Sequence, residues 1–298
     1  MNTADLFKYK TVFSLEVFPP KRESSLQSIY SAFDNLKEIR PDYISVTYGA
    51  GGSSNINATA NIADRLVHNY GYTAVAHLAG IGLKKADVEH IIDNLLPMGV
   101  NNILALRGDE RDDLEKGDFE HAVDLISYIK GKYGDKVNII AACYPEGHIE
   151  AHNIVDDVKH LKEKVDAGAS QLITQLFFNN DSFYRFKERC DLVGIKVPIQ
   201  AGIMPVANKK QIERIVTLCG VELPAKFTKI MSKYEDNPEA LRDAGIAYAI
   251  DQIVDLITQG IDGIHLYTMN ERGMRTKSWT PLLILTKSEP VLYRAQSS

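Results

Sequence analysis

The feature that most constrains this chain is a strict alternation of short apolar runs with longer stretches of helical periodicity. Each apolar run has the length and composition of a strand buried on both faces. There are eight such runs: Val12–Phe18, Tyr43–Tyr48, Thr73–Leu78, Ile103–Leu106, Val137–Cys143, Gln171–Phe178, Val197–Ile203 and Gly263–Thr268. Between them apolar residues recur with helical spacing, as in Val88-Ile91-Ile92-Leu95-Leu96. The pattern predicts an α/β fold, a single (β/α)8 barrel over residues 1–298.

The connection between the seventh and eighth runs is much longer than the others. It extends from about Pro205 to Asp262, and Pro224 and Pro238 are expected to divide it. Since a barrel needs one helix at this point, the sequence predicts extra helices between strands seven and eight.

A doubly wound sheet is the competing architecture, because Gly49–Ser54 resembles a dinucleotide-binding loop. Ser54 replaces the third glycine of that motif. We therefore interpret the segment as a flexible loop after the second strand. A nucleotide cofactor would have to bind without a Rossmann motif.

Composition excludes several classes of function. The formal net charge is −5 and there is no basic tract, which argues against a nucleic-acid partner. No apolar run is long enough to span a membrane, and the N-terminus lacks a signal-peptide core. The three cysteines form no CxxC pair, so we expect reduced thiols in a cytoplasmic protein and no zinc site.

Polar residues stand where most of the predicted strands end. Barrel enzymes take their catalytic groups from the carboxyl ends of the strands. These positions hold Glu16, Thr47, Tyr48, His77, Arg107, Asp109, Tyr144, His148, Gln175, Tyr267 and Asn270. No HxH pair marks a metal hydrolase, although His77 and His265 are candidates for ligands, and no strand core carries the lysine of a Schiff-base aldolase. The set suits a large, polar, partly aromatic ligand and proton transfer.

Glu16 lies in the first apolar run, where Ser14, Glu16 and Phe18 alternate with apolar residues and so share one face of the strand. If that face points into the barrel, Glu16 is a carboxyl at its mouth, and partial burial would suit it to act as a general acid. A solvated carboxylate at the end of the strand is the alternative.

Seven motifs at seven of the eight strand ends together carry a family resemblance. In order they are Ser-Leu-Glu-Val-Phe-Pro-Pro-Lys (14–21), Ser-Val-Thr-Tyr-Gly-Ala (45–50), Ala-Leu-Arg-Gly-Asp (105–109), Tyr-Pro-Glu-Gly-His (144–148), Ile-Thr-Gln-Leu-Phe-Phe (173–178), Gly-Ile-Met-Pro-Val (202–206) and Leu-Tyr-Thr-Met-Asn (266–270). The chain resembles methylenetetrahydrofolate reductase of the bacterial type. The resemblance implies a (β/α)8 barrel with non-covalent FAD. It implies reduction of 5,10-methylenetetrahydrofolate to 5-methyltetrahydrofolate with NADH or NADPH.

The same resemblance implies residue roles. Glu16 would be the general acid that protonates N10 of the folate, and Asp109 would lie beside flavin and pterin and favour the iminium cation. The positions that match flavin contacts are Thr47, Tyr48, Ala50, His77, Arg107, Gly108, Asp109, Tyr144, His148, Ala151, Asp157 and Lys164. Gln175, Gln211 and Arg272 match folate contacts. Since Gln175 is also expected to meet the nicotinamide, the two substrates would bind in turn, with ping-pong kinetics.

Three departures from the family pattern affect these roles. Relatives commonly place two cations near the FAD phosphates, where this chain has Glu163-Lys164. Glu271 replaces an arginine that follows the last asparagine, which leaves Arg272 as the candidate for the folate tail. Ile215 belongs to a segment that lacks the aromatic cover some relatives have.

Two other functions remain open on sequence alone. A pterin-binding methyltransferase barrel would hold methyltetrahydrofolate without flavin, and a non-catalytic flavin or folate binder would serve a larger redox complex. The sequence does not choose between NADH and NADPH. Because relatives usually associate, we expect a homo-oligomer.

Overall fold

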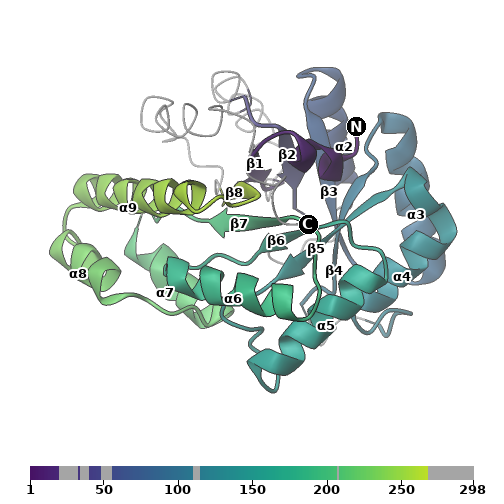
Figure 1. Ribbon diagram of the computed structural model, residues 1–298. Helices are drawn as coiled ribbons and strands as arrows, with labels where there is room; N and C mark the ends of the chain where they lie inside the picture. Colours follow the sequence, from purple (N-terminus) through teal and green to yellow (C-terminus); the bar gives the residue numbers. More distant parts are fainter. Residues whose placement is uncertain (20–32, 34–39, 48–55, 110–114, 207, 268–298) are drawn as a thin grey trace.

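The computed structural model describes residues 1–19, 33, 40–47, 56–109, 115–206 and 208–267, and within them eight parallel strands close into a barrel in sequential order (Figure 1). The strands are β1 (Val12–Val17), β2 (Tyr43–Val46), β3 (Thr73–Ala79), β4 (Asn102–Leu106), β5 (Asn138–Cys143), β6 (Gln171–Thr174), β7 (Ile199–Ile203) and β8 (Gly263–Tyr267). β1 pairs with both β2 and β8, which closes the barrel. The predicted (β/α)8 fold is confirmed.

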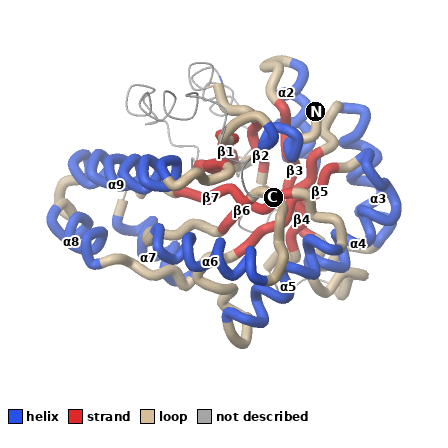
Figure 2. The backbone as a smooth tube through the Cα atoms, in the orientation of Figure 1, coloured by secondary structure: helices blue, strands red, loops and turns tan. Residues whose placement is uncertain are grey.

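Helices surround the strands, as Figure 2 shows in blue around the red barrel. They are α2 (Ile56–His68), α3 (Lys85–Leu95), α4 (Ala122–Tyr133), α5 (Ile154–Asp166), α6 (Asn180–Leu192), α7 (Lys209–Cys219), α8 (Ala225–Lys233) and α9 (Pro238–Thr258). The last three fill the long connection, where Pro224 caps α8 and Pro238 begins α9, so the predicted extra helices are confirmed. Among the described residues, no helix combines the length and apolarity needed to cross a membrane.

The predicted sixth strand, Gln171–Phe178, is too long, because β6 ends at Thr174. Leu176 and Phe178 pack with α7, α8 and α9, and the ring of Phe178 stacks on Phe227 of α8 with centroids 4.4 Å apart. The apolar run therefore continues beyond the strand to cover the extra helices. Gln175 consequently lies in the loop after β6.

The amino end of the barrel is closed by a 3₁₀ helix, Thr3–Lys8, whose Leu6 and Phe7 pack against Val12, Tyr43 and Leu104 inside the barrel. Around this apolar contact lies a set of buried amides. The Thr3 hydroxyl donates to Gln171 Oε1 at 2.7 Å and accepts from Asn138 Nδ2 at 3.0 Å. The same Asn138 Nδ2 donates to Asn102 Oδ1 at 3.0 Å. This end of the barrel is a closed, hydrogen-bonded plug.

Candidate functional site

Glu16 lies inside the barrel near its carboxyl end and is only 6% exposed. Its Oε2 is 3.5 Å from Nε2 of His77 on β3 and 3.6 Å from Nε2 of His265 on β8. Strand register explains the second neighbour, because Ser14 pairs with His265 and Glu16 pairs with Tyr267. Of the two orientations that the sequence left open for Glu16, the structure shows the one that points into the barrel, with the carboxyl buried and not solvated.

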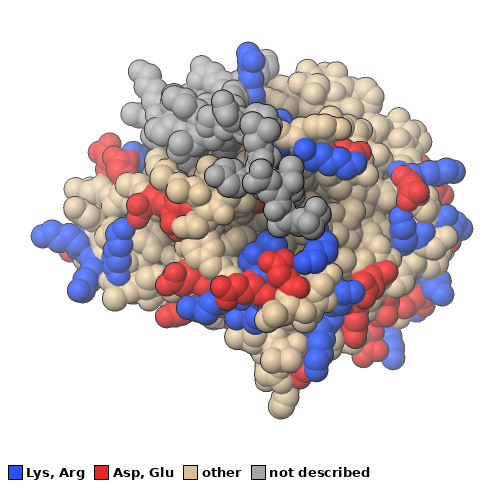
Figure 3. Space-filling model, in the orientation of Figure 1, with Lys and Arg blue, Asp and Glu red and all other residues tan. Residues whose placement is uncertain are grey.

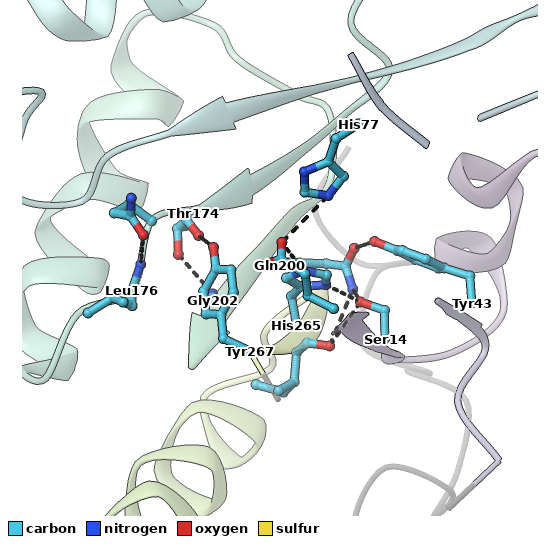
Figure 4. A network of polar contacts seen from close by, with 12 residues as sticks. Ser14, Tyr43, His77, Thr174, Leu176, Gln200, Gly202, His265 and Tyr267 are labelled. Carbon is cyan, nitrogen blue, oxygen red and sulfur yellow. Dashed lines mark hydrogen bonds and ion pairs between the residues drawn. The ribbon is translucent and has the colours of Figure 1, made fainter. Parts of the chain in front are cut away.

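Burial dominates the electrostatics around Glu16. It lowers the pKa of His77 to about 4, although the negative charge of Glu16 opposes the shift. The His77 imidazole is therefore neutral at neutral pH. Burial and then the Glu16 charge raise the pKa of Tyr267, whose hydroxyl donates to the Thr174 carbonyl at 2.7 Å. Figure 4 shows Tyr267 beside Thr174 and Gly202, and His77 above His265.

Several polar atoms near the carboxyl end of the barrel have no hydrogen-bond partner within the described part of the chain. They are Ser45 Oγ, Thr47 Oγ1, His77 Nε2 and His265 Nε2. Ser45 pairs with Glu16 in the strand register. A buried polar atom without a partner costs about 1–3 kcal/mol. Such atoms around one carboxyl are what a binding site for a polar ligand requires.

The Arg107-Gly108-Asp109 turn follows β4, as predicted. Gly108 has a φ of 93°, and a Cβ there would come within 2.8 Å of the Ile81 side chain, so the turn requires glycine. Arg107 binds the carboxylate of Glu150 with both terminal nitrogens, at 2.5 and 2.7 Å. Arg107 therefore pairs with a glutamate that lies after β5. Asp109 is exposed.

A second group of predicted residues gathers where β5 meets α5. The rings of Tyr144 and His148 lie edge to face with centroids 4.6 Å apart. Lys164 Nζ lies 5.9 Å from the Tyr144 ring centroid and donates to the Ala142 carbonyl at 3.2 Å. Burial lowers the pKa of Lys164 and raises the pKa of the Asp157 carboxyl, which interacts with Lys164 and His148. Four residues separated in sequence therefore form one polar cluster.

The remaining predicted site residues belong to neither of these two groups of side chains. Ala151 closes the turn after β5 with a backbone bond to His148 at 2.9 Å. Gln175 Oε1 accepts from the Leu176 amide at 2.9 Å, which fixes the direction in which its NH₂ group donates. Gln211 is buried on α7. Tyr48, Ala50 and Arg272, together with Asn270 and Glu271, lie outside the described residues.

Two of the three departures, Glu163 and Ile215, lie among the described residues, as do two neighbours of the site that were not predicted from the sequence. Glu163 is exposed, whereas the next residue, Lys164, reaches back to β5. Ile215 is buried in the apolar cluster under α7 and α8. Sequence reasoning missed Ser45, although the inward alternation Tyr43-Ser45-Thr47 could have indicated it. It also missed Glu150, for which the sequence holds no local signal.

The surface carries charges of both signs. Basic and acidic side chains are interspersed over the face seen in Figure 3, and that face shows no extended basic area among the described residues. In the described part of the chain, no three His, Cys, Asp or Glu side chains are arranged to hold a metal ion.

Comparison with solved structures supports the architecture. An uncharacterized protein from Clostridium thermocellum that binds two copies of 5-methyl-5,6,7,8-tetrahydrofolic acid superposes with a TM-score of 0.62 at 14% identity, over 95% of each chain. A 2,3-dimethylmalate lyase superposes with a TM-score of 0.52 at 12% identity, over 100% of this chain and 92% of the lyase. At such identities the likeness concerns the fold alone.

Sequence comparison identifies the family. The family model described as methylenetetrahydrofolate reductase matches residues 2–278. The chain is 36% identical over 257 residues to 5,10-methylenetetrahydrofolate reductase of Pectobacterium carotovorum subsp. carotovorum, covering 86% of this chain and 85% of the relative. The corresponding protein of Escherichia coli (strain K12) is 34% identical over 261 residues, covering 88% and 87%.

A plant relative is longer. Methylenetetrahydrofolate reductase (NADH) 1 of Arabidopsis thaliana is 36% identical over 275 residues, which is 88% of this chain and 46% of the plant protein. The chain thus spans about half the length of the plant relatives that it matches. Since the family model covers residues 2–278 and the bacterial relatives match over most of their length, the chain belongs to the methylenetetrahydrofolate reductase family.

Proposed function

We propose that this protein reduces 5,10-methylenetetrahydrofolate to 5-methyltetrahydrofolate, with FAD as cofactor and NADH or NADPH as electron donor. The observation that carries the proposal is Glu16, a buried carboxyl near the carboxyl end of a barrel, with imidazole nitrogens of His77 and His265 at 3.5 and 3.6 Å. Family membership supplies the substrate class. All of residues 1–298 are included in this single catalytic domain.

The described residues fit a flavin. Thr47 Oγ1 and His77 Nε2 are buried atoms that have no partner among the described residues. Gly108 keeps the backbone after β4 free of a side chain. Arg107 and Lys164 offer positive charge toward an anionic cofactor. Tyr144, His148, Ala151, Asp157, Asp109 and the undescribed Tyr48 and Ala50 would complete the FAD contacts. When bound, the flavin would supply two-electron transfer between nicotinamide and folate.

Glu16 would hold the proton that N10 of the folate needs when the five-membered ring opens. Its burial keeps water away from the carboxyl, and its place near the barrel mouth allows a proton to pass directly to a bound nitrogen. The Asp109 carboxylate would place negative charge near the resulting cation. Gln175, Gln211 and Arg272 would bind the folate. Because Gln175 serves both substrates, they would bind alternately, as ping-pong kinetics requires.

The first test is an absorbance spectrum of the purified protein, followed by anaerobic titration with NADH and then with methylenetetrahydrofolate. We expect flavin bands that bleach on the first addition and return on the second. A colourless protein that gains no flavin bands with added FAD would exclude the reductase and leave the methyltransferase alternative. Bands that respond to a protein electron donor but not to NADH or NADPH would favour a subunit of a redox complex.

A further inference from the structure

We propose that His265 is a positioning residue for the acid: a hydrogen-bond chain from Tyr43 through Gln200 and Ser14 fixes its proton on Nε2, where it points at the Glu16 carboxyl. The inference deepens the proposed function, since it depends on Glu16 acting as the acid there. The chain runs across the inside of the barrel from β2 to β7, β1 and β8 (Figure 4).

The direction of each hydrogen bond is set from the amino end of the barrel. Thr3 donates to Gln171 Oε1 at 2.7 Å, so the NH₂ group of Gln171 is the end that faces the Tyr43 hydroxyl at 3.3 Å. With its oxygen accepting from Gln171, Tyr43 directs its one hydroxyl proton to Gln200 Oε1. The NH₂ group of Gln200 then donates to Ser14 Oγ at 3.0 Å.

Ser14 is the last link of the chain, and the direction of its hydrogen bond decides which nitrogen of His265 carries the proton. Its Oγ lies 2.7 Å from His265 Nδ1 and 3.5 Å from the Ile264 carbonyl. A hydroxyl has one proton, and 2.7 Å is the distance of a good O–H donor whereas 3.5 Å is too long. Nδ1 is therefore the acceptor, and a neutral ring must carry its proton on Nε2.

Packing holds the ring in this orientation. His265 is fully buried. Its ring stacks beside Tyr43 with centroids 6.4 Å apart and meets Tyr267 edge to face at 5.2 Å. A ring flip would have to displace both aromatic neighbours and break the 2.7 Å contact with Ser14. The Nε2–H direction is thus determined by the barrel and not by solvent.

The consequence for Glu16 follows from charge. Nε2 of His265 is 3.6 Å from Oε2, longer than a hydrogen bond, and has no other partner within the described chain. Catalytic hydrogen bonds are often long before substrate binds and shorten in the reacting complex. As Glu16 gives up its proton it becomes a carboxylate, and an N–H donor stabilises that charge. Among the described residues, His77 from β3 and Tyr267 from β8 also interact with Glu16, and the Tyr267 hydroxyl donates to the Thr174 carbonyl.

Nitrogen-15 NMR of the full-length protein with ring-labelled histidine tests the chain without any assay of turnover. We expect His265 to show a protonated Nε2 and an unprotonated Nδ1 at neutral pH. Ser14→Ala should move the ring toward the Nδ1–H form, since the donor to Nδ1 is gone. Ser182→Ala is the matched control: it removes a buried hydroxyl on α6, outside this hydrogen-bond chain, and His265 should not respond. A wild-type ring protonated on Nδ1, or on both nitrogens, would overturn the proposal.

Stopped-flow absorbance tests the effect on the acid. His265→Leu should slow the folate half-reaction about tenfold to hundredfold, less than the roughly 10²–10³ lost with a direct oxyanion donor. Flavin reduction by NADH should change less than about threefold, as it needs no acid. His265→Gln, which keeps an N–H donor, should recover most of the loss.

The pH profile separates positioning from a merely structural role. Without the donor, the carboxylate is less favoured, so the basic limb of the folate half-reaction should move to higher pH in His265→Leu and Ser14→Ala. An unmoved limb, or equal damage to both half-reactions, would contradict the proposal. If the wild-type protein shows no folate half-reaction at all, the proposed function fails, while the NMR result still decides whether the hydrogen-bond chain exists.

Discussion

Polar side chains line both ends of the barrel interior, but the two ends differ in whether those side chains have hydrogen-bond partners. At the amino end Thr3, Asn102, Asn138 and Gln171 bond to one another. At the carboxyl end Ser45, Thr47, His77 and His265 each keep an atom that no described group satisfies. Since each such atom costs about 1–3 kcal/mol, the carboxyl end gives up stability that the amino end retains. The difference separates polar residues that build the fold from those arranged for a ligand.

The largest expected effect on stability is a loss in acid caused by His77. Its pKa in the folded protein is about 4, against 6.5 for an unperturbed histidine, so the unfolded chain binds the proton more tightly. The stability it contributes is complete above about pH 6.5 and is lost as the pH falls toward 4, by about 3 kcal/mol in all. Urea unfolding at several pH values should therefore show a steeper acid loss in wild type than in His77→Gln. Equal slopes would mean that His77 is not held neutral by burial.

A matched pair of isosteric substitutions tests the comparison directly. Thr3→Val removes a hydroxyl with three hydrogen-bond partners and should lower the free energy of unfolding by about 2 kcal/mol. Thr47→Val removes a buried hydroxyl that has no partner in the described chain and should raise the free energy of unfolding by about 1–3 kcal/mol. Denaturant unfolding of the cofactor-free proteins measures both. A similar loss in the two variants would remove the distinction between the ends.

The same Thr47→Val variant should affect the ligand instead. If the Thr47 hydroxyl forms a hydrogen bond with the flavin, its loss removes about 1 kcal/mol of binding free energy and weakens FAD binding about fivefold. Fluorescence titration of the apoprotein with FAD gives the dissociation constant, with Thr3→Val as control. Unchanged affinity in Thr47→Val would assign that hydroxyl to another ligand or to none.

The smallest expected effect concerns Glu150, which pairs with Arg107. The Glu150 and Arg107 side chains are 54% and 24% exposed, and exposed ion pairs contribute only about 0–1 kcal/mol. Glu150→Gln should release Arg107 and tighten FAD binding by a factor of about two to five. Glu188→Gln, which removes the same charge from the exposed surface of α6, controls for net charge. Weaker binding in Glu150→Gln would show that the glutamate helps to hold the cofactor.

The features that could be predicted from the sequence depend only on residues close together in the chain. The alternation around Glu16 placed Ser14 and Glu16 on the same face of β1 without deciding whether that face points inward, and the length of the segment between Pro205 and Asp262 predicted extra helices. Contacts across the barrel were not predictable. Tyr43 meets Gln200 only because the barrel closes, and nothing near Arg107 in sequence indicates Glu150. The end of β6 was predicted too late for a related reason. The residues after the strand are also apolar, because they pack against α8, and the sequence alone does not show that contact.

The most direct test of the account is the effect of Glu16→Gln on the two half-reactions, measured separately by stopped-flow absorbance. Glu146→Gln is a matched control, because it makes the same change at a partly buried carboxyl in the loop after β5, where Glu146 accepts from the Glu222 amide at 2.9 Å. General acid catalysis contributes roughly 10²- to 10⁴-fold, so Glu16→Gln should lose at least that lower factor with folate while flavin reduction by NADH changes less than about tenfold. Equal losses in both half-reactions would contradict the account, because Glu16 would then shape the pocket without serving as its acid.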